Sequence, residues 1–185
     1  MQHPVSKDLD TLLDFLSEDL RADGVEKWNH WRQHTNKNLR VHLSHSNFSG
    51  FRLMGIDFRN ADLRGCNFTK ADLYNANFDG AELDLADFTF ANLTKAKLST
   101  SLSNVTFIES VFKETDFSGA RMSHTTFSGI DLSEAKGLES VSHWRRSYLS
   151  IDTLFLSKGK IPVDFLRGCG VPEDFITYMD SLILV

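Results

Sequence analysis

The sequence predicts a mainly β protein whose chain winds into a square coil of stacked parallel strands between short helical ends. Two observations carry this prediction: a large apolar residue stands at every fifth position from Leu43 to Leu98, and a small residue usually stands two places before it. A period of five matches neither an α-helix, with about 3.6 residues per turn, nor a strand, with a repeat of about 2. The chain must therefore turn a corner every five residues, and short repeats of this kind form solenoids.

Each five-residue unit should turn two side chains inward and leave the others outside. The central residue is Leu or Phe, the residue two places earlier is small, as at Ala71 or Cys66, and the residue just before the centre is polar, as at Asp72. We expect the central and small residues to fill the interior. The centres of this first stretch are Leu43, Phe48, Leu53, Phe58, Leu63, Phe68, Leu73, Phe78, Leu83, Phe88, Leu93 and Leu98.

The repeat slips by one residue after Leu98, and its centres then become Leu102, Phe107, Phe112, Phe117, Met122, Phe127 and Leu132. If one unit between Ala96 and Ser99 has lost a residue at a corner, the centres sort into four columns that are almost five coils deep. Each buried Phe or Leu then contributes about 1.5–3 kcal/mol. The predicted core ladder comprises Phe48, Phe68, Phe88, Phe107 and Phe127 in one column, Phe58, Phe78 and Phe117 opposite, and Leu63, Leu73, Leu83 and Leu93 between them.

The repeated unit resembles that of the pentapeptide-repeat family, A-(D/N)-L-x-x. Residues 61–65 (Ala-Asp-Leu-Arg-Gly), 71–75 (Ala-Asp-Leu-Tyr-Asn) and 91–95 (Ala-Asn-Leu-Thr-Lys) match it directly. The resemblance covers about half of the chain and implies the family's right-handed quadrilateral parallel β-helix. Later units, such as 110–112 and 125–127, lack both the Ala and the Asp or Asn.

The pattern divides the chain into a helical N-terminal cap (1–40), the repeat (41–137) and a short-helical C-terminal cap or junction (138–185). A solenoid needs caps because its open ends expose core side chains and unpaired backbone groups. A second helix beginning at Asp23 would carry Trp28 and Trp31 over the first coil, although a partner-binding surface is the alternative. The first predicted helix rests on the spacing of Leu9, Leu12, Leu13, Leu16 and Leu20.

The C-terminal residues predict two helices, one beginning at Pro162 and ending near 168–170, and one opened by Pro172. The apolar ending of the chain would pack on the last coil, pair with a second copy or mark a domain junction. The segments 25–32, 151–154 and 161–172 also resemble those of larger bacterial pentapeptide-repeat proteins that carry a C-terminal effector domain of the Toll-receptor-like (TIR) type. That resemblance implies an effector activity, such as NAD cleavage, outside these residues.

Composition and motifs give no sign of catalysis. The formal net charge is −5, and residues 41–137 hold 12 acidic and nine basic side chains without a basic stripe, so direct nucleic-acid binding is not favoured. The two cysteines, Cys66 and Cys169, form no metal-ligand spacing, and no apolar run approaches the roughly 20 residues that span a bilayer. We expect a cytoplasmic protein with no catalytic residues, cofactor or metal.

Two groups of residues are candidates for an interface. Trp144, Arg145 and Arg146 follow the repeat and combine an aromatic ring with two cations, as interface anchors do. The interpretation that we favour from the sequence is that Trp144 caps the last coil while the arginines face solvent. The second group is the apolar C-terminus, Ile183, Leu184 and Val185, through which the chain could dimerise.

The sequence therefore predicts a non-enzymatic scaffold that mediates association with a protein partner or with itself, as the regulatory or oligomerisation module of a bacterial effector or signalling protein. The alternative that the family resemblance implies is a DNA mimic that occupies DNA gyrase and confers quinolone resistance. The nine basic residues of the repeat interrupt the negative surface that such a mimic requires.

Overall fold

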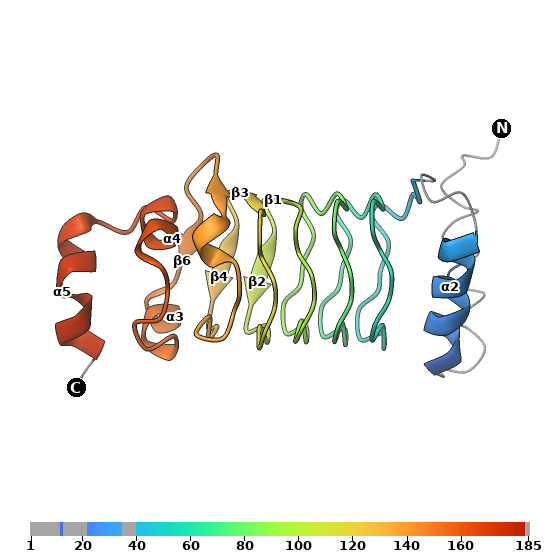
Figure 1. The fold of residues 1–185 in the computed structure, drawn as a ribbon, viewed down its shortest axis with the longest axis horizontal. Helices are drawn as coiled ribbons and strands as arrows, with labels where there is room; N and C mark the ends of the chain where they lie inside the picture. Colours follow the sequence, from blue (N-terminus) through green and yellow to red (C-terminus); the bar gives the residue numbers. More distant parts are fainter. Residues whose placement is uncertain (1–11, 13–21, 35–39, 184–185) are drawn as a thin grey trace.

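The computed structural model describes residues 12, 22–34 and 40–183 (Figure 1). Successive turns of the chain stack along the long axis of the molecule. Helix α2 (Ala22–His34) covers the N-terminal end of the stack, and helices α3 (Ile151–Leu156), α4 (Val163–Gly168) and α5 (Glu173–Ile183) lie at the other end. Of the first predicted helix, only Leu12 lies within the described residues, and it is buried. Helix α2 begins at Ala22, one residue before the predicted start at Asp23.

Parallel backbone pairing joins each turn to the next. Leu43 donates its N–H to the carbonyl of Asp62 (2.9 Å), and the Asp62 N–H donates to Val41 (2.8 Å). Such pairings recur at every fifth residue along the chain. In the first turns, each pairing joins two residues that are twenty positions apart in the sequence. The bridges from the first turn to the second are His42 to Asp62, Asn47 to Asn67, Arg52 to Asp72 and Asp57 to Asn77. The chain is thus a parallel β-solenoid.

The polar residue before each centre stabilises the corner that follows. The Asn67 side-chain oxygen accepts a hydrogen bond from the Thr69 N–H (2.9 Å), and Asp87 does the same for Thr89 (2.9 Å). Such side chains mimic a backbone turn, which explains why Asp and Asn recur at this position. The second residue after most centres has a left-handed backbone, as at Gly65 (φ 64°). A Cβ there would lie 2.5 Å from Nδ1 of His45, so a larger residue would have to displace that exposed side chain, and glycine also adopts this conformation without strain.

The predicted slip of one residue is confirmed. Pairing across it joins residues nineteen apart, such as Glu82 to Ser101 and Lys97 to Asp116, and returns to twenty at Asp116 to Lys136. The shortened corner is visible in the hydrogen bonds. Thr100 donates its N–H to the Leu98 carbonyl, two residues back, whereas the corners before it close over three residues, as Ala96 does on Leu93.

The interior is a set of buried side-chain columns. Each of the twelve Phe and Leu residues of the predicted ladder is fully buried. Rings of one column stack face to face, with centroids 5.2 Å apart for Phe48 and Phe68, 4.9 Å for Phe68 and Phe88, and 5.4 Å for Phe107 and Phe127. Stacked pairs add about 0.5–1.5 kcal/mol to the burial term.

Longer strands form where the coil approaches its C-terminal end. β1 (Ser101–Ser103), β3 (Arg121–Ser123) and β5 (Ser142–His143) form one parallel sheet, and β2 (Thr106–Ile108), β4 (Thr126–Ser128) and β6 (Tyr148–Leu149) form another. A short 3₁₀ helix, η1 (Leu138–Ser140), precedes β5. Strand pairing thus continues past Gly137, where the five-residue pattern ends, because longer connections carry β5 and β6 onto the coil. Helix α4 begins at Val163, with Pro162 just before it, and α5 follows Pro172.

Candidate functional site

The N-terminal end of the coil is closed by side chains of α2. In the middle of the stack, backbone groups of one turn pair with those of the previous turn, whereas no earlier turn precedes the first one within the part of the chain that the structure describes. Asn29 accepts the Asp57 N–H at its Oδ1 (2.8 Å) and donates its Nδ2 to the Gly55 carbonyl (2.9 Å). Trp28 donates its indole N–H to the Asp57 carbonyl (2.9 Å). These side chains therefore replace a missing turn.

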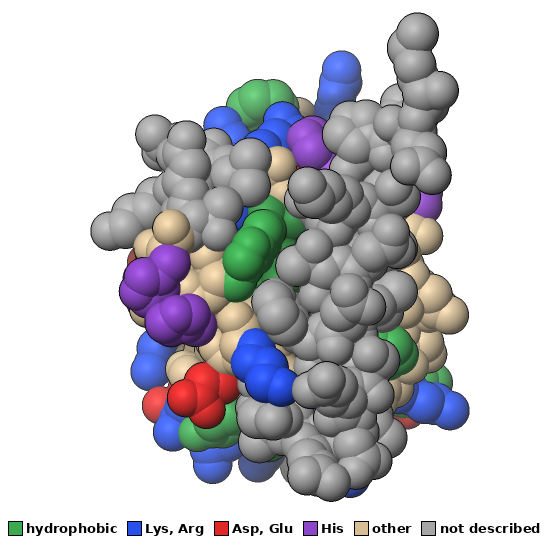
Figure 2. All heavy atoms as spheres, turned by 90° about the vertical axis from the view of Figure 1, so that its right-hand side faces the viewer, with side chains coloured by type: hydrophobic (Ala, Val, Ile, Leu, Met, Phe, Trp, Pro, Cys, Tyr) green, Lys and Arg blue, Asp and Glu red, His purple; other side chains and the backbone are tan. Residues whose placement is uncertain are grey.

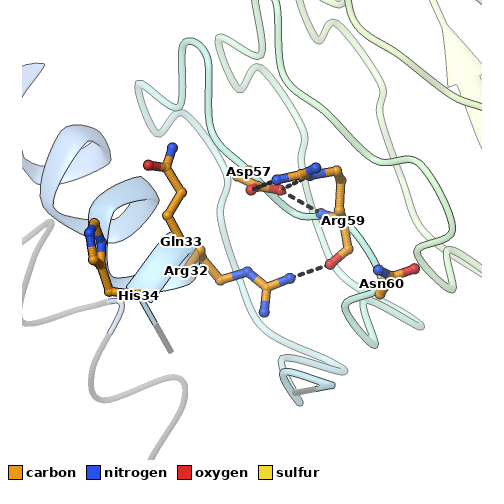
Figure 3. Close-up of a pocket in the computed structure, with 6 residues that line it drawn as sticks. All are labelled: Arg32, Gln33, His34, Asp57, Arg59 and Asn60. Carbon is orange, nitrogen blue, oxygen red and sulfur yellow. Dashed lines mark hydrogen bonds and ion pairs between the residues drawn. The ribbon is translucent and has the colours of Figure 1, made fainter. Parts of the chain in front are cut away.

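A polar pocket of about 510 Å³ lies beside these contacts (Figure 3). Arg32, Gln33 and His34 line it from α2, and Asp57, Arg59 and Asn60 line it from the first turn. The Arg59 guanidinium donates to both carboxylate oxygens of Asp57, at 2.9 and 2.7 Å. Burial raises the pKa of Asp57, but these hydrogen bonds outweigh it and leave that pKa below its ordinary value.

The Arg32 guanidinium donates to the Arg59 carbonyl, so both cations of the pocket are engaged with groups of the junction itself (Figure 3). Figure 2 looks onto this end of the molecule, where hydrophobic side chains of the described residues surface only in small separate areas. We interpret the pocket as the seam of a structural cap. The interpretation of Trp28 as a cap residue agrees with its full burial.

The carboxylates of the coil are also engaged in structure. Asp62 is 2% exposed and accepts hydrogen bonds from Nε and Nη2 of Arg64 at 2.8 and 2.6 Å. These bonds hold the pKa of Asp62 at about 2. Arg40 pairs with Glu82 on the next turn, which extends the ion pairs along the coil. No group of three or more His, Cys, Asp or Glu within the described residues is arranged to hold a metal ion.

Neither cysteine is placed for nucleophilic chemistry. The Cys66 thiol is buried in the small inward position and donates to the Leu43 carbonyl (3.0 Å), and burial raises its pKa to about 12. Burial likewise raises the pKa of Cys169 to about 12. A thiolate is the reactive form, so both side chains remain inert near neutral pH. None of the described helices combines the length and apolar character needed to cross a bilayer.

The interpretation of Trp144 as the cap of the last coil is wrong. Its side chain is 72% exposed, and the Arg121 guanidinium lies over the ring, 5.7 Å from the centroid. The last coil is covered instead by Phe165 of α4, whose ring meets Phe127 at 5.7 Å. The structure therefore leaves Trp144 free for contacts outside the chain.

Trp144 belongs to a wider surface, which we call the basic-aromatic surface and define as Arg121, His124, Trp144, Arg145 and Tyr148. All five side chains are exposed. The rings of His124 and Tyr148 face each other at an interplanar angle of 28°, with centroids 6.4 Å apart.

The sequence pointed to Trp144 and Arg145 but not to the other three members of the basic-aromatic surface. They come together only because β5 pairs with β3 and β6 pairs with β4. The paired residues are separated in sequence by numbers that are not multiples of five, so the repeat does not predict them.

Two other predicted interface elements lie elsewhere. Arg146 is exposed, but its Cδ lies 2.8 Å from where a Cβ of Gly170 would be, which places it against the connection from α4 to α5. Ile183 ends α5, and its side chain and residues 184–185 lie outside what the structure describes. The prediction of a C-terminal dimer contact therefore stays a prediction.

The fold and its surfaces define a class: a parallel β-solenoid with a packed interior, whose described residues show no grouping of side chains that matches a known catalytic centre. The family model for pentapeptide repeats (8 copies) matches residues 40–78, 66–101 and 100–136, more than half of the chain. The chain belongs to the pentapeptide-repeat family. No protein with a curated description matches it significantly.

Solved structures of the same kind resemble it weakly. QnrB1, a plasmid-mediated fluoroquinolone resistance protein, is 18% identical, with a TM-score of 0.41 over 60% of this chain and 59% of that one. A pentapeptide-repeat protein from the thylakoid lumen of Arabidopsis thaliana is 33% identical (TM-score 0.28; 51% and 63% covered). Rfr23 of the cyanobacterium Cyanothece 51142 is 20% identical (0.35; 64% and 67%). The chain thus spans less than two thirds of the first two, and at these scores the likenesses carry no argument about function.

Proposed function

We propose that this chain is a non-enzymatic scaffold that associates with a protein partner, or with a second copy, through the C-terminal end of its coil. The observation that carries the proposal is the position of Trp144, a large aromatic side chain that is 72% exposed and stacked under a cation. Trp and Arg are the residues most enriched among the side chains that dominate binding energies.

The distribution of the other side chains supports this proposal. The centres of the repeat are buried in columns. The polar residue before many of them forms a hydrogen bond within a turn or an ion pair. What the coil offers to another molecule is its outer surface. We further propose that the solenoid is right-handed and four-sided, with about five coils, which would give it flat faces for docking.

A photo-crosslinking amino acid at Ser142 tests the proposal. Ser142 is exposed on β5, paired with Arg121, and precedes an inward residue. The matched control is Lys97, which is exposed at the same place in its repeat, before Leu98. In cells of the source organism, we expect a discrete protein adduct from Ser142 and none from Lys97.

The mass of the adduct separates a second copy of this 21.0 kDa chain from another protein. No adduct from Ser142, or equal adducts from both sites, would contradict the proposal. The prediction that the chain serves a larger effector protein is tested separately, by reading the gene on both sides of these residues.

The DNA-mimic alternative is less consistent with the surface of the molecule. Arg121, Trp144 and Arg145 place two cations and an indole where a duplex mimic would need negative charge. A gyrase supercoiling assay with the purified chain decides the point. We expect neither inhibition nor protection from a quinolone, and either effect at micromolar protein would favour the mimic.

A further inference from the structure

We propose that the basic-aromatic surface binds a carboxylate-rich segment of a partner protein. The inference rests on the proposed function and goes further, because it names the chemistry of the partner. It follows from three observations: where the arginines lie, what surrounds them, and which charges are missing nearby.

The first observation is the arrangement of Arg121 and Trp144. Arg121 is in β3, Trp144 directly follows the adjacent strand β5, and the guanidinium lies 5.7 Å from the centre of the indole. A guanidinium stacked on an aromatic face is held in place by a cation–π contact, and its N–H groups stay available for a two-pronged contact with a carboxylate. The stack therefore orients the Arg121 guanidinium for contact with an anionic partner. The exposed Trp144 ring can make an apolar contact beside it.

The second observation is the lack of carboxylates in the strands around Arg121. In the sheet, its neighbours are Ser101 on one side and Ser142 on the other. Elsewhere along the coil, basic residues meet acidic ones on the next turn, as Lys136 meets Glu114 (3.3 Å). The serines leave Arg121 without that internal partner.

The third observation concerns the ion pairs of the described residues as a whole. Arg40, Arg59, Arg64 and Arg167 each pair with a carboxylate. Between described residues, no carboxylate reaches ion-pair distance of Arg121 or Arg145. A chain of net charge −5 thus exposes Arg121 and Arg145 without a described carboxylate at ion-pair distance, as it also does Arg52 and Arg146.

A carboxylate-rich protein segment fits the basic-aromatic surface better than a nucleic acid. Nucleic acid binding depends on many phosphate contacts along an extended basic surface. Here the surface holds only two arginines and a histidine, and Glu82 and Asp62 occupy the same outward position two and three turns away from Arg121. A short acidic segment carrying apolar side chains matches both the arginines and the rings of Trp144 and Tyr148.

The test uses the full chain and a fluorescein-labelled peptide of three Glu-Gly-Leu-Glu units, measured by fluorescence anisotropy. The same peptide with Gln in place of Glu removes the charge, and a single-stranded DNA of twelve nucleotides tests the other class of polyanion. We expect only the Glu peptide to bind, with an affinity that falls as salt screens the arginines between about 50 and 300 mM.

The variants Arg121→Glu and Arg145→Glu should each weaken binding by about tenfold or more, as expected for an interface anchor. The matched control is Arg52→Glu. Arg52 is exposed, stands at the same place in its repeat as Arg121, and lies on a different side of the coil. Arg52→Glu should change the dissociation constant less than about twofold, since only its long-range charge is lost.

Several results would overturn the inference: no binding of the Glu peptide at 1 mM, equal binding of the Gln peptide, equal weakening by Arg52→Glu, or tighter binding of the DNA. If the peptide fails while Ser142 still gives a protein adduct in cells, the scaffold function stands and only the acidic character of the partner is wrong. If both fail, the scaffold function itself is contradicted.

Discussion

The two ends of the coil are closed by different chemistry. At the N-terminal end, Trp28 and Asn29 of α2 hydrogen-bond to backbone groups of the first turn and so imitate a neighbouring strand. At the C-terminal end, Phe165 of α4 adds its ring to the column that ends at Phe127. The first cap continues the hydrogen bonding of the solenoid and also its core, since the Trp28 ring packs on Phe58 (centroids 6.3 Å), whereas α4 continues the core.

This difference shows that a solenoid end has two separate deficits. The outer edge leaves backbone donors and acceptors without partners, and the outer layer of the core leaves apolar side chains facing water. The N-terminal cap meets both, because Asn29 and Trp28 supply hydrogen bonds and the Trp28 ring packs on Phe58, whereas α4 meets the second through Phe165. In the middle of the coil, the turns on either side supply both the backbone hydrogen bonds and the apolar packing. A substitution there should therefore cost more stability than one at either cap.

The largest effect is expected in the middle of the coil. Phe88→Asp buries an unpaired carboxylate between Phe68 and Phe107 and should unfold the solenoid, because burying an isolated charge costs more than the stability of a typical domain allows. Circular dichroism and urea titration measure the loss. Asp87→Ser, one residue earlier and facing outward, keeps a side-chain oxygen for the turn onto Thr89 and should cost no more than about 1 kcal/mol. Equal effects would contradict the assignment of inside and outside.

The next largest effect is expected at the C-terminal cap. Phe165 is 1% exposed and packs against both Phe127 and His143. Phe165→Ala should destabilise the docking of α4 by about 3–5 kcal/mol, the usual cost of removing a buried Phe. Hydrogen exchange of the α4 amides measures this locally. Val163→Ala, on an exposed position of the same helix, should leave the exchange nearly unchanged.

A smaller effect is expected at the N-terminal cap. Asn29→Ala leaves the Asp57 N–H and the Gly55 carbonyl without their partner and should cost about 1–3 kcal/mol, the usual penalty for an unsatisfied group. Alanine favours the helix, so the loss cannot come from α2 itself. Gln33→Ala, exposed on the same helix, is the matched control. A cost for Asn29→Ala equal to that of Phe165→Ala would remove the distinction between the two ends.

The sequence predicted the coil well because every unit obeys the same geometry. The positions of Phe48, Phe88 and Phe127 follow from spacing alone, and even the lost residue before Thr100 could be located from the shift of the centres. Left-handed corners are less visible, since Leu85 (φ 65°) and Phe90 (φ 61°) adopt the conformation that glycine fills elsewhere. Repetition compensates for such individual exceptions.

The ends could not be predicted in the same way because their contacts occur once. Asn29 reaches a backbone carbonyl 26 residues away, a pairing that no local pattern encodes. The cap interpretation of Trp144 was wrong because the longer connections into β5 place its side chain outward beside Arg121. A surface that depends on single long-range contacts can be recognised only once the structure is known. The proposed binding surface is of this kind.

The smallest effect, and the most specific to the C-terminal end, is expected from His143. It pairs with Met122 in the sheet, at the end of an inward column, and its ring meets Phe165 at 5.1 Å. A Cβ on Gly168 would lie 2.1 Å from the ring, so glycine makes room for it. Both ring nitrogens are buried without a hydrogen-bond partner among the described residues, and burial lowers the pKa of His143 below its ordinary 6.5.

Because the folded-state pKa of His143 lies below the unfolded one, the unfolded chain binds the proton more readily. Docking of α4 should therefore be unaffected above pH 6.5 and weaken as the pH falls from 6.5 through the lowered pKa. Hydrogen exchange of α4, corrected for the intrinsic effect of pH, measures this. His143→Phe removes the proton-binding group and should abolish the dependence, whereas His124→Phe, an exposed site, should retain it. A pH dependence that survives in His143→Phe would mean that another group binds the proton. His143 would then not be the group that makes the C-terminal cap sensitive to pH.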